Sequence, residues 1–399
     1  MIGISKLYCG AVEAADVLRY GRDVRRLPSH LLQFAQDKRP VVVWNMTRRC
    51  NLKCVHCYAS AGGAAAPDEL TTAEAKDMIA DLAVFGAPVI LFSGGEPLLR
   101  PDLAELAAFA TARGMRAVIS TNGVLLTSER IAVFRDIGLS YIGVSLDGME
   151  GTHDRLRGVH GAFAATLRGI RACRDGGIKV GIRFTISRRN FQDIPAIFDL
   201  AAAEQIPRIC FYHLVYSGRG SALCGEDLSH AQTRAVVDLI MTRTRQLFKS
   251  GFPAEVLTVD NHADGPYLYL RLRRENPYRA AQVLELLRMN GGNSSGSSIG
   301  CISWDGEVYA DQFWRNHSFG NVRHRPFSAI WTDTSEPLMA KLKDKARHIE
   351  GRCAHCCWLA VCAGNFRARA EAATGNIWAS DPACYLTDTE IALAPEVVT

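Results

Sequence analysis

Short apolar, β-branched segments alternate with amphipathic segments of helical period from residue 40 to about residue 216. This pattern is typical of repeated βα units, in which parallel strands form a central sheet that helices cover. Six such units are too few to close an eight-stranded barrel, so we expect an α/β fold built on an open, partial (β/α)6 TIM-like barrel. The strand candidates are Val41–Asn45, Pro88–Phe92, Arg116–Ser120, Tyr141–Ser145, Lys179–Thr185 and Arg208–Leu214.

The segments between these strands place apolar side chains at helical spacing, and several begin at a Ser, Thr or Asp cap and end near Gly. The barrel region is therefore expected to span residues 40–225, with its functional loops after the strand C-termini. The predicted helices are Thr72–Phe85, Asp102–Arg113, Ser128–Ile137, Gly161–Asp175 and Asp193–Glu204.

Three further regions complete the chain. Residues 1–39 predict an N-terminal helical extension, and residues 226–295 predict a helical linker after the barrel. Residues 296–399 follow a Gly/Ser-rich stretch, open on the hairpin-like sequence CISWDGEVYA and carry a dense group of cysteines, so we expect a separate domain there. The segments with helical spacing outside the barrel are Val12–Leu18, Leu27–Phe34, Ala231–Lys249 and Ala280–Met289.

Thirteen cysteines are many for a chain of 399 residues whose first residues show no apolar stretch followed by a cleavage site. Without export, such cysteines favour metal ligation over disulfides, and we expect a cytoplasmic protein. No stretch approaches 18 uninterrupted apolar residues, so a membrane is not an expected partner. Nor is nucleic acid, because the net charge is only +5, from 46 basic and 41 acidic residues.

Three cysteines, Cys50, Cys54 and Cys57, follow directly on the first predicted strand in the sequence CNLKCVHCY. Cubane iron–sulfur clusters normally take four cysteine thiolates, so three from one loop leave one iron open to a ligand from outside the protein. The alternative is a zinc site or buried free thiols. Zinc sites usually pair one C-x-x-C with a second, and no second pair is adjacent.

With this spacing the sequence resembles the radical S-adenosylmethionine (SAM) superfamily, whose signature is C-x-x-x-C-x-x-C with an aromatic residue before the last cysteine. Here His56 occupies that aromatic position. The resemblance covers residues 40–216 and implies a [4Fe–4S] cluster on the three cysteines with SAM at its open iron. It also implies that one electron from the reduced cluster cleaves SAM to a 5′-deoxyadenosyl radical, while the protein positions the substrate.

Short polar motifs at the ends of the next strands extend this resemblance. SGGEP begins at Ser93, STNG at Ser120 and SLDG at Ser145. Glycines let the backbone approach a ligand closely, and in the family such positions contact the amino group and hydroxyls of SAM. Arg183, on the fifth strand, is the candidate for the SAM carboxylate. The predicted SAM-binding residues are Gly94, Gly95, Glu96, Asn122, Ser145, Asp147 and Arg183.

A second group of cysteines lies near the C-terminus with the spacing C-x2-C-x5-C-x21-C. It resembles the SPASM/twitch-like extension of radical SAM enzymes, which implies an auxiliary [4Fe–4S] cluster and two clusters in total. A full SPASM domain binds two auxiliary clusters, but Asp311 and Phe366 stand where further cysteines are expected. A zinc site remains the alternative, and the roles of Cys301 and Cys357 stay open. The predicted ligands are Cys353, Cys356, Cys362 and Cys384.

Three segments between the barrel and the second cysteine group are rich in His, Arg and aromatic residues, at 211–220, 258–269 and 310–327. Arg pairs with carboxylates and aromatic rings cover flat ligands, although such residues also pack ordinary domain junctions. Here the chain resembles radical SAM enzymes of modified-tetrapyrrole synthesis, in particular the NirJ family of haem d1 assembly. The resemblance implies removal of two propionate side chains from an iron-containing didecarboxysiroheme.

A tetrapyrrole substrate would place cations and histidines in specific roles. Arg219, Arg315 and Arg323 are candidate carboxylate clamps, and His213, His262 and His317 are candidate iron ligands or proton donors. A one-electron donor of flavodoxin or ferredoxin type is the expected protein partner. Three alternatives remain: a sister decarboxylase or deacetylase of the siroheme-dependent haem route, a SPASM peptide-modifying enzyme, and a non-catalytic iron–sulfur carrier.

Overall fold

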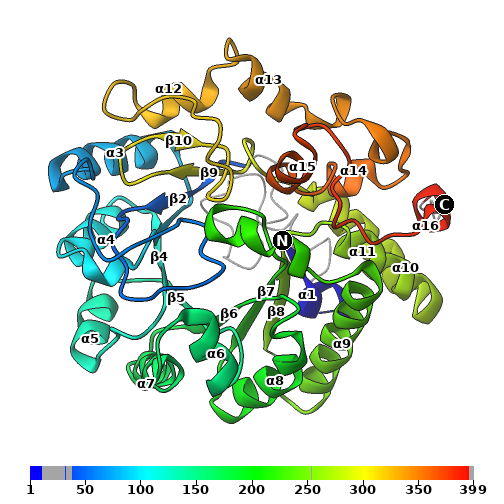
Figure 1. Ribbon diagram of the computed structural model, residues 1–399, viewed down its shortest axis with the longest axis horizontal. Helices are drawn as coiled ribbons and strands as arrows, with labels where there is room; N and C mark the ends of the chain where they lie inside the picture. The colour runs from blue at the N-terminus through cyan, green and yellow to red at the C-terminus, as the bar shows by residue number, and fades with distance from the viewer. Residues whose placement is uncertain (11–31, 33–37, 253, 395–399) are drawn as a thin grey trace.

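The computed structural model describes residues 1–10, 32, 38–252 and 254–394, which form a curved sheet with helices on its outer face (Figure 1). The sheet has ten strands in the order β1-β8-β7-β6-β5-β4-β3-β2-β9-β10. The strands are β1 (Ile2–Gly3), β2 (Val41–Asn45), β3 (Val89–Ser93), β4 (Arg116–Thr121), β5 (Tyr141–Ser145), β6 (Val180–Thr185), β7 (Arg208–Tyr212), β8 (Glu255–Val259), β9 (Ile299–Ile302) and β10 (Val308–Tyr309).

The six predicted strands correspond to β2–β7, which pair in parallel in sequence order and confirm the partial barrel. Their apolar residues, such as Val42, Ile90 and Ile182, are buried, as expected for parallel strands covered on both faces. The outer helices are α3 (Thr72–Phe85), α4 (Leu103–Thr111), α5 (Ser128–Asp136), α6 (Glu150–Arg157), α7 (Ala162–Asp175), α8 (Ile194–Ala203) and α9 (His230–Lys249).

Two further parallel strands extend the sheet at its two ends. β8 pairs with β7 and β9 pairs with β2, so the segment 226–295, predicted as a helical linker, also contributes the strand β8 to the sheet. The five residues of β8 lie between long helical segments, which obscure so short an apolar run. β1 pairs antiparallel with β8, and the predicted hairpin is confirmed by the antiparallel pair β9–β10.

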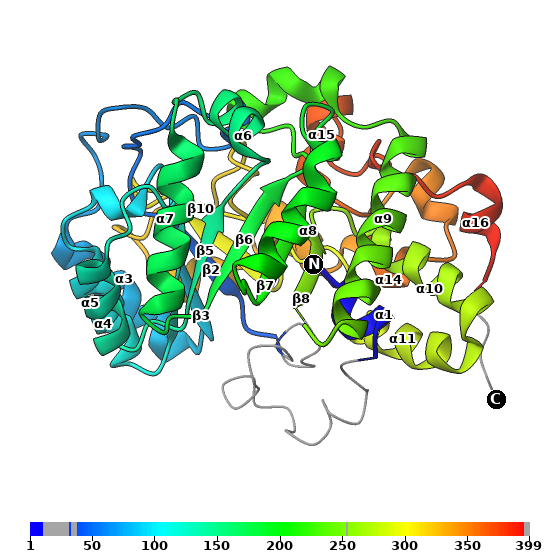
Figure 2. The same cartoon turned by 90° about the horizontal axis from the view of Figure 1, so that it is seen from below.

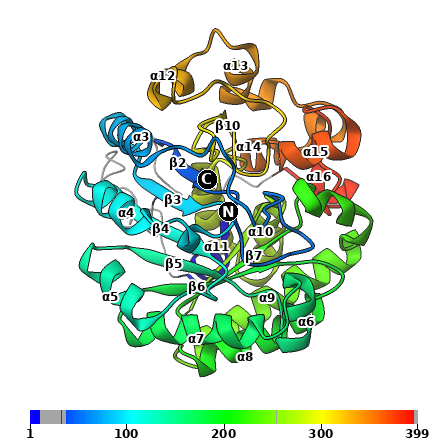
Figure 3. The ribbon, with the colours of Figure 1, turned by 60° about the vertical axis from the view of Figure 1, so that its left-hand side comes forward.

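The C-terminal part of the chain lies beside the sheet, next to β9 and β10 and the helices that follow β8, and completes the ring of helices (Figures 2 and 3). Its helices are short, except for the pair that follows β8. They are α10 (Asp264–Glu275), α11 (Pro277–Asn290), α12 (Phe327–Thr332), α13 (Pro337–Lys343), α14 (Leu359–Cys362), α15 (Arg367–Thr374) and α16 (Asp388–Ala392). Near the N-terminus α1 (Ile4–Tyr8) packs beside β8, whereas the predicted helices at 12–18 and 27–34 fall outside the described residues, Leu32 excepted.

Arg369 of α15 joins the C-terminal part to the barrel. Its guanidinium forms an ion pair with Asp381 at 2.8 Å, and both side chains are fully buried. The same group donates to the backbone oxygens of Leu214, at 3.0 Å, and Asp260, at 2.9 Å, which lie just beyond β7 and β8. A buried charge is tolerated only when it is paired and hydrogen-bonded, so this cation fixes α15 against the strand ends.

No helix in the described part of the chain is long and apolar enough to cross a membrane.

Replacing Arg369 with Ala should lower the free energy of unfolding by about 3–5 kcal/mol, because Asp381 would remain buried and unpaired. Arg347→Ala is the control, since Arg347 pairs with Asp344 at 3.0 Å on an exposed surface. Exposed pairs contribute only about 0–1 kcal/mol. Urea unfolding followed by circular dichroism measures both losses, and losses of equal size would contradict the structural role of Arg369.

Candidate active site

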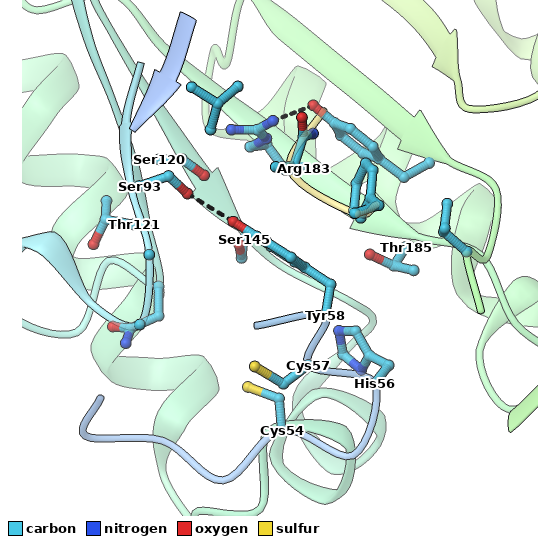
Figure 4. Close-up of a pocket in the computed structure, with 18 of the residues that line it drawn as sticks. Cys54, His56, Cys57, Tyr58, Ser93, Ser120, Thr121, Ser145, Arg183 and Thr185 are labelled. Carbon is cyan, nitrogen blue, oxygen red and sulfur yellow. Dashed lines mark hydrogen bonds between the residues drawn. The ribbon is translucent and has the colours of Figure 1, made fainter. Parts of the chain in front are cut away.

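The three cysteines of the long loop between β2 and α3 line one pocket at the C-terminal ends of the strands. Cys50, Cys54 and Cys57 line a cavity that is also lined by residues from β3 to β7 and from the loops that follow them. Figure 4 shows Cys54 and Cys57 in this cavity. All three are free thiols, and burial raises the pKa of Cys50 to about 11, with smaller contributions from Cys54 and Cys57. The structure therefore brings the three thiols together with an open space beside them.

Glycines fix the loop after β3 against the cysteine loop. A side chain at Gly95 would place its Cβ 2.2 Å from the backbone oxygen of Arg49, and one at Gly94 would lie 2.6 Å from that of Thr47. Gly94 also has a φ of +126°, which favours glycine. Both glycines line the pocket, and their predicted contact with SAM stays a prediction.

Asn122, Ser145 and Arg183 also line the pocket, as predicted. They come from the ends of β4, β5 and β6, three neighbouring strands of the sheet. Arg183 is held in place, because its Nη2 donates to the hydroxyl of Tyr212 at 2.5 Å and its guanidinium lies 4.9 Å from that ring. These residues can supply a cation and polar groups to a bound SAM molecule.

Glu96 does not reach the pocket, contrary to the prediction that it binds the SAM amino group. Its carboxylate is fully buried and accepts from the hydroxyl of Thr121 at 2.7 Å and from the backbone nitrogens of Asn122 and Leu98 at 2.8 and 3.0 Å. Both oxygens of this buried carboxylate are therefore satisfied by groups of the protein. Glu96 therefore positions Asn122 and the loop after β4.

Asp147, which is also predicted to bind SAM, is fully buried and is not among the residues that line the pocket. Its fully buried Oδ2 lies 3.0 Å from Nε2 of His56 and forms an ion pair with Arg157, while Oδ1 accepts from the backbone nitrogen of Thr185 at 2.7 Å. Burial alone would raise the pKa of Asp147, but the charge of Arg157 and the hydrogen bond with His56 hold that pKa well below its usual range. Arg157 in turn donates to the sulfur of Cys54 at 3.5 Å.

The predicted carboxylate clamps are all engaged elsewhere. Arg219 donates to the backbone oxygens of Cys54 and Ala61, each at 2.8 Å, and so braces the cysteine loop. Arg315 stacks on Trp304 at 4.1 Å, and Arg323 pairs with Glu74 at 2.7 Å near the surface. None of the three lines the pocket. Each guanidinium instead interacts with a backbone carbonyl, an aromatic ring or a carboxylate of the protein.

Of the three predicted histidines, only His213 lines the pocket. Its Nε2 lies 2.9 Å from Oδ2 of Asp264, and both side chains are buried. His262 is buried without lining the pocket, and His317 pairs with Glu371 at 2.6 Å on α15. The proposed catalytic roles of His262 and His317 therefore have no support from the geometry.

Several pocket residues were not selected from the sequence, although their segments were. Asp260, Gln312 and Phe313 line the pocket, and all lie in the His-, Arg- and aromatic-rich segments. Tyr58, directly after Cys57, also lines it and donates to Asn45 at 2.8 Å. A signal for Asp260 is its position one residue past β8, but that strand was itself missed.

The second cysteine group is drawn together from three segments of the C-terminal part. Burial raises the pKa of Cys362 to about 12, and the neighbouring thiols of Cys384, Cys353 and Cys356 raise it further. A side chain at Gly292 would lie 2.3 Å from the backbone of Cys362, so the Gly/Ser stretch packs on this site. Cys357 is exposed, and Cys301 is buried on β9 beside Asn45. Among the described residues, no three His, Cys, Asp or Glu side chains are arranged to hold a single metal ion.

Comparisons with known proteins agree with this geometry. Residues 44–201 match the model of the radical SAM superfamily, and residues 295–358 match the SPASM iron–sulfur cluster-binding domain. The chain is 66% identical over 394 residues to Fe-coproporphyrin III synthase of Methanosarcina barkeri, covering 98% of this chain and 99% of the relative. The chain belongs to the radical SAM superfamily.

This radical SAM enzyme is also 42% identical over 363 residues to pre-heme d1 synthase of Dinoroseobacter shibae, covering 90% of this chain and 89% of the relative. Among solved structures, Streptococcus suis SuiB bound to S-adenosylmethionine superposes with a TM-score of 0.69 at 16% identity, over 87% of this chain and 77% of that one. That likeness supports the α/β fold with its SPASM domain. The family match establishes [4Fe–4S] clusters and SAM as cofactors.

Replacing Cys50, Cys54 and Cys57 together with Ala should abolish SAM cleavage but leave about four irons per chain, because a cubane at the other site would remain. The reciprocal variant, Cys353→Ala with Cys362→Ala, should lose the same amount of iron from the second site. Cys357→Ala is the matched control, since this exposed thiol should hold no iron. Iron content and 5′-deoxyadenosine measured under anaerobic reduction test the assignment. Continued SAM cleavage by the triple variant would overturn it.

Proposed function

We propose that this enzyme removes acetate-derived side chains from an iron tetrapyrrole of the siroheme-dependent haem route and produces iron coproporphyrin III. The observation that supports this reaction is the 66% identity to Fe-coproporphyrin III synthase over nearly the whole of both chains. The haem d1 reaction, predicted from the sequence, becomes the second candidate. Its support is the 42% identity to pre-heme d1 synthase over 363 residues.

In this proposal Cys50, Cys54 and Cys57 hold the cluster that binds SAM at its open iron. Reduction of that cluster cleaves bound SAM and supplies a 5′-deoxyadenosyl radical, which takes a hydrogen atom from the substrate. Gly94 and Gly95 allow the backbone to approach SAM, and Arg183 pairs with its carboxylate. Asp147 and Arg219 keep the cysteine loop in position from below, as their contacts to His56, Cys54 and Ala61 show.

The C-terminal part closes the pocket over the substrate in this proposal. Gln312 and Phe313 line the cavity from the segment after β10, and Phe313 packs edge-on against Tyr58 at 5.0 Å. Aromatic rings at this position can cover the face of a flat macrocycle and exclude water from the reacting carbon. Cys353, Cys356, Cys362 and Cys384 would hold an auxiliary [4Fe–4S] cluster.

We also propose that a cytoplasmic flavodoxin or ferredoxin supplies the electrons. Both clusters require reduced thiols, which the cytoplasm maintains, and all thirteen cysteines are free in the structure. The tetrapyrrole is then the only small substrate besides SAM that the proposal requires.

The reaction is tested by anaerobic incubation of the reconstituted, dithionite-reduced enzyme with SAM and iron didecarboxysiroheme. We expect 5′-deoxyadenosine together with a macrocycle whose mass equals that of iron coproporphyrin III. Loss of propionate mass instead would favour the haem d1 reaction. Formation of 5′-deoxyadenosine with an unchanged macrocycle would contradict both tetrapyrrole proposals and leave only the family assignment.

A further inference from the structure

Asp260 is held in an unusual backbone conformation at the edge of the pocket. It follows β8 directly and has a φ of +67°, a left-handed conformation that residues other than glycine rarely adopt. Such strain persists where the surrounding structure imposes it, and it is concentrated at functional sites. Here Arg369 donates to the backbone oxygen of Asp260 at 2.9 Å, and the next residue, Asn261, donates to the backbone oxygen of Ala383 at 2.9 Å.

Asp260 is among the residues that line the pocket, and one of its carboxyl oxygens has no hydrogen-bond partner in the described part of the chain. The residue is 7% exposed, and its buried Oδ2 has no hydrogen-bond partner among the described residues. Buried carboxylates are normally satisfied by donors, as Glu96 is in this same protein. An unsatisfied carboxyl group in a strained loop facing the pocket is therefore available to a ligand.

His213 lies beside Asp260 on the neighbouring strand end. Tyr212 of β7 pairs with Val259 of β8, and the backbone nitrogen of His213 donates to the oxygen of Val259 at 3.0 Å. Both side chains line the pocket. Asp264 links His213 to Tyr385, whose hydroxyl donates to Oδ1 of Asp264 at 2.7 Å. The acid thus stands next to a histidine that a buried carboxylate holds in one orientation.

We propose that Asp260 is the catalytic acid of this enzyme, donating a proton from its carboxyl group to the carbon of the departing side chain, with His213 returning that proton. This inference rests on the proposed function, because it assigns the proton that removal of an acetate-derived group requires. Asp260 lies outside the cysteine motif that defines the radical SAM signature.

The chemistry balances with one proton and one electron for each side chain. A hydrogen atom passes from the macrocycle to the 5′-deoxyadenosyl radical, and the bond between the ring carbon and the side chain then breaks homolytically, leaving a ring double bond. The departing carbon radical gains one electron from the flavodoxin- or ferredoxin-type donor and one proton from Asp260, and it leaves as acetate. The Asp260 carboxylate is then reprotonated from solvent through His213.

Burial keeps this acid protonated near neutral pH. It raises the pKa of Asp260 to about 7, and the carboxylate of Asp311 raises it further, whereas the amino group of Met1, Arg369 and His213 lower it. A general acid is most effective when its pKa lies near the working pH.

The test compares wild-type enzyme with Asp260→Asn in deuterated buffer, using SAM and iron didecarboxysiroheme. Wild type should release acetate that carries one deuterium from the exchangeable acid. Asparagine has nearly the shape of aspartate and tolerates the left-handed backbone, so Asp260→Asn should still form 5′-deoxyadenosine. Without the acid, it should release roughly 100-fold less acetate per deoxyadenosine. Asp136→Asn, on the exposed end of α5, is the control and should behave as wild type.

Three outcomes would overturn the role of Asp260. They are acetate without deuterium from wild type, an unchanged ratio of acetate to deoxyadenosine in Asp260→Asn, and an equal loss of acetate and deoxyadenosine in that variant. If Asp260→Asn fails to assemble its clusters, as iron content shows, Asp260→Gly removes the same acid and relieves the backbone strain. Asp260→Gly should release as little acetate per deoxyadenosine as is expected for Asp260→Asn. Wild type that forms deoxyadenosine but releases no acetate would instead contradict the proposed function.

A pH profile separates proton donation from a structural role. In wild type the acetate released per deoxyadenosine should fall as the pH rises through about 7, because the carboxyl group must be protonated to donate. Asp260→Asn should lose this dependence and remain low at every pH. Asp260→Glu, which restores a carboxyl group, should recover part of the acetate release; a profile shared by wild type and Asp260→Asn would contradict the proposal.

Discussion

The buried negative charge of Asp147 organises the catalytic half of this structure. Its Oδ2 lies 3.0 Å from His56, inside the cysteine motif, and pairs with Arg157, whose guanidinium reaches the sulfur of Cys54. Because a buried carboxylate must be paired, these contacts attach the cysteine loop to the ends of β5 and β6. The orientation of the thiols, and hence the open face of the pocket, depends on this one charge.

A second buried charge plays the corresponding part for the C-terminal half. Arg369 holds Asp381 and the backbone just beyond β7 and β8, so α15 and the auxiliary cysteines are fixed relative to the barrel. The same contacts impose the left-handed backbone of Asp260 and place its carboxyl group beside His213. The SPASM part therefore shapes the pocket wall in addition to carrying a cluster site.

The sequence predicted the elements that repeat and missed those that depend on long-range contacts. β2–β7 and the cysteine loop follow from periodicity and spacing, and both were placed within a few residues. Glu96, Asp147 and Arg219 were identified as site residues, but the protein groups that they contact were not foreseen, because only the fold shows which groups satisfy a buried charge. β8 was too short to detect between helices, and Asp260 was missed with it. Its significance lies in a φ angle and an unpaired oxygen, which no residue pattern encodes.

The most direct test of the account follows hydrogen from the macrocycle to the radical. Iron didecarboxysiroheme carrying deuterium on its saturated ring carbons would be incubated anaerobically with SAM and the reduced enzyme, and the 5′-deoxyadenosine analysed by mass spectrometry. If the pocket brings the tetrapyrrole to the site of SAM cleavage, the deoxyadenosine gains deuterium. Deoxyadenosine without deuterium, formed while the macrocycle is bound, would contradict a radical attack on these ring carbons.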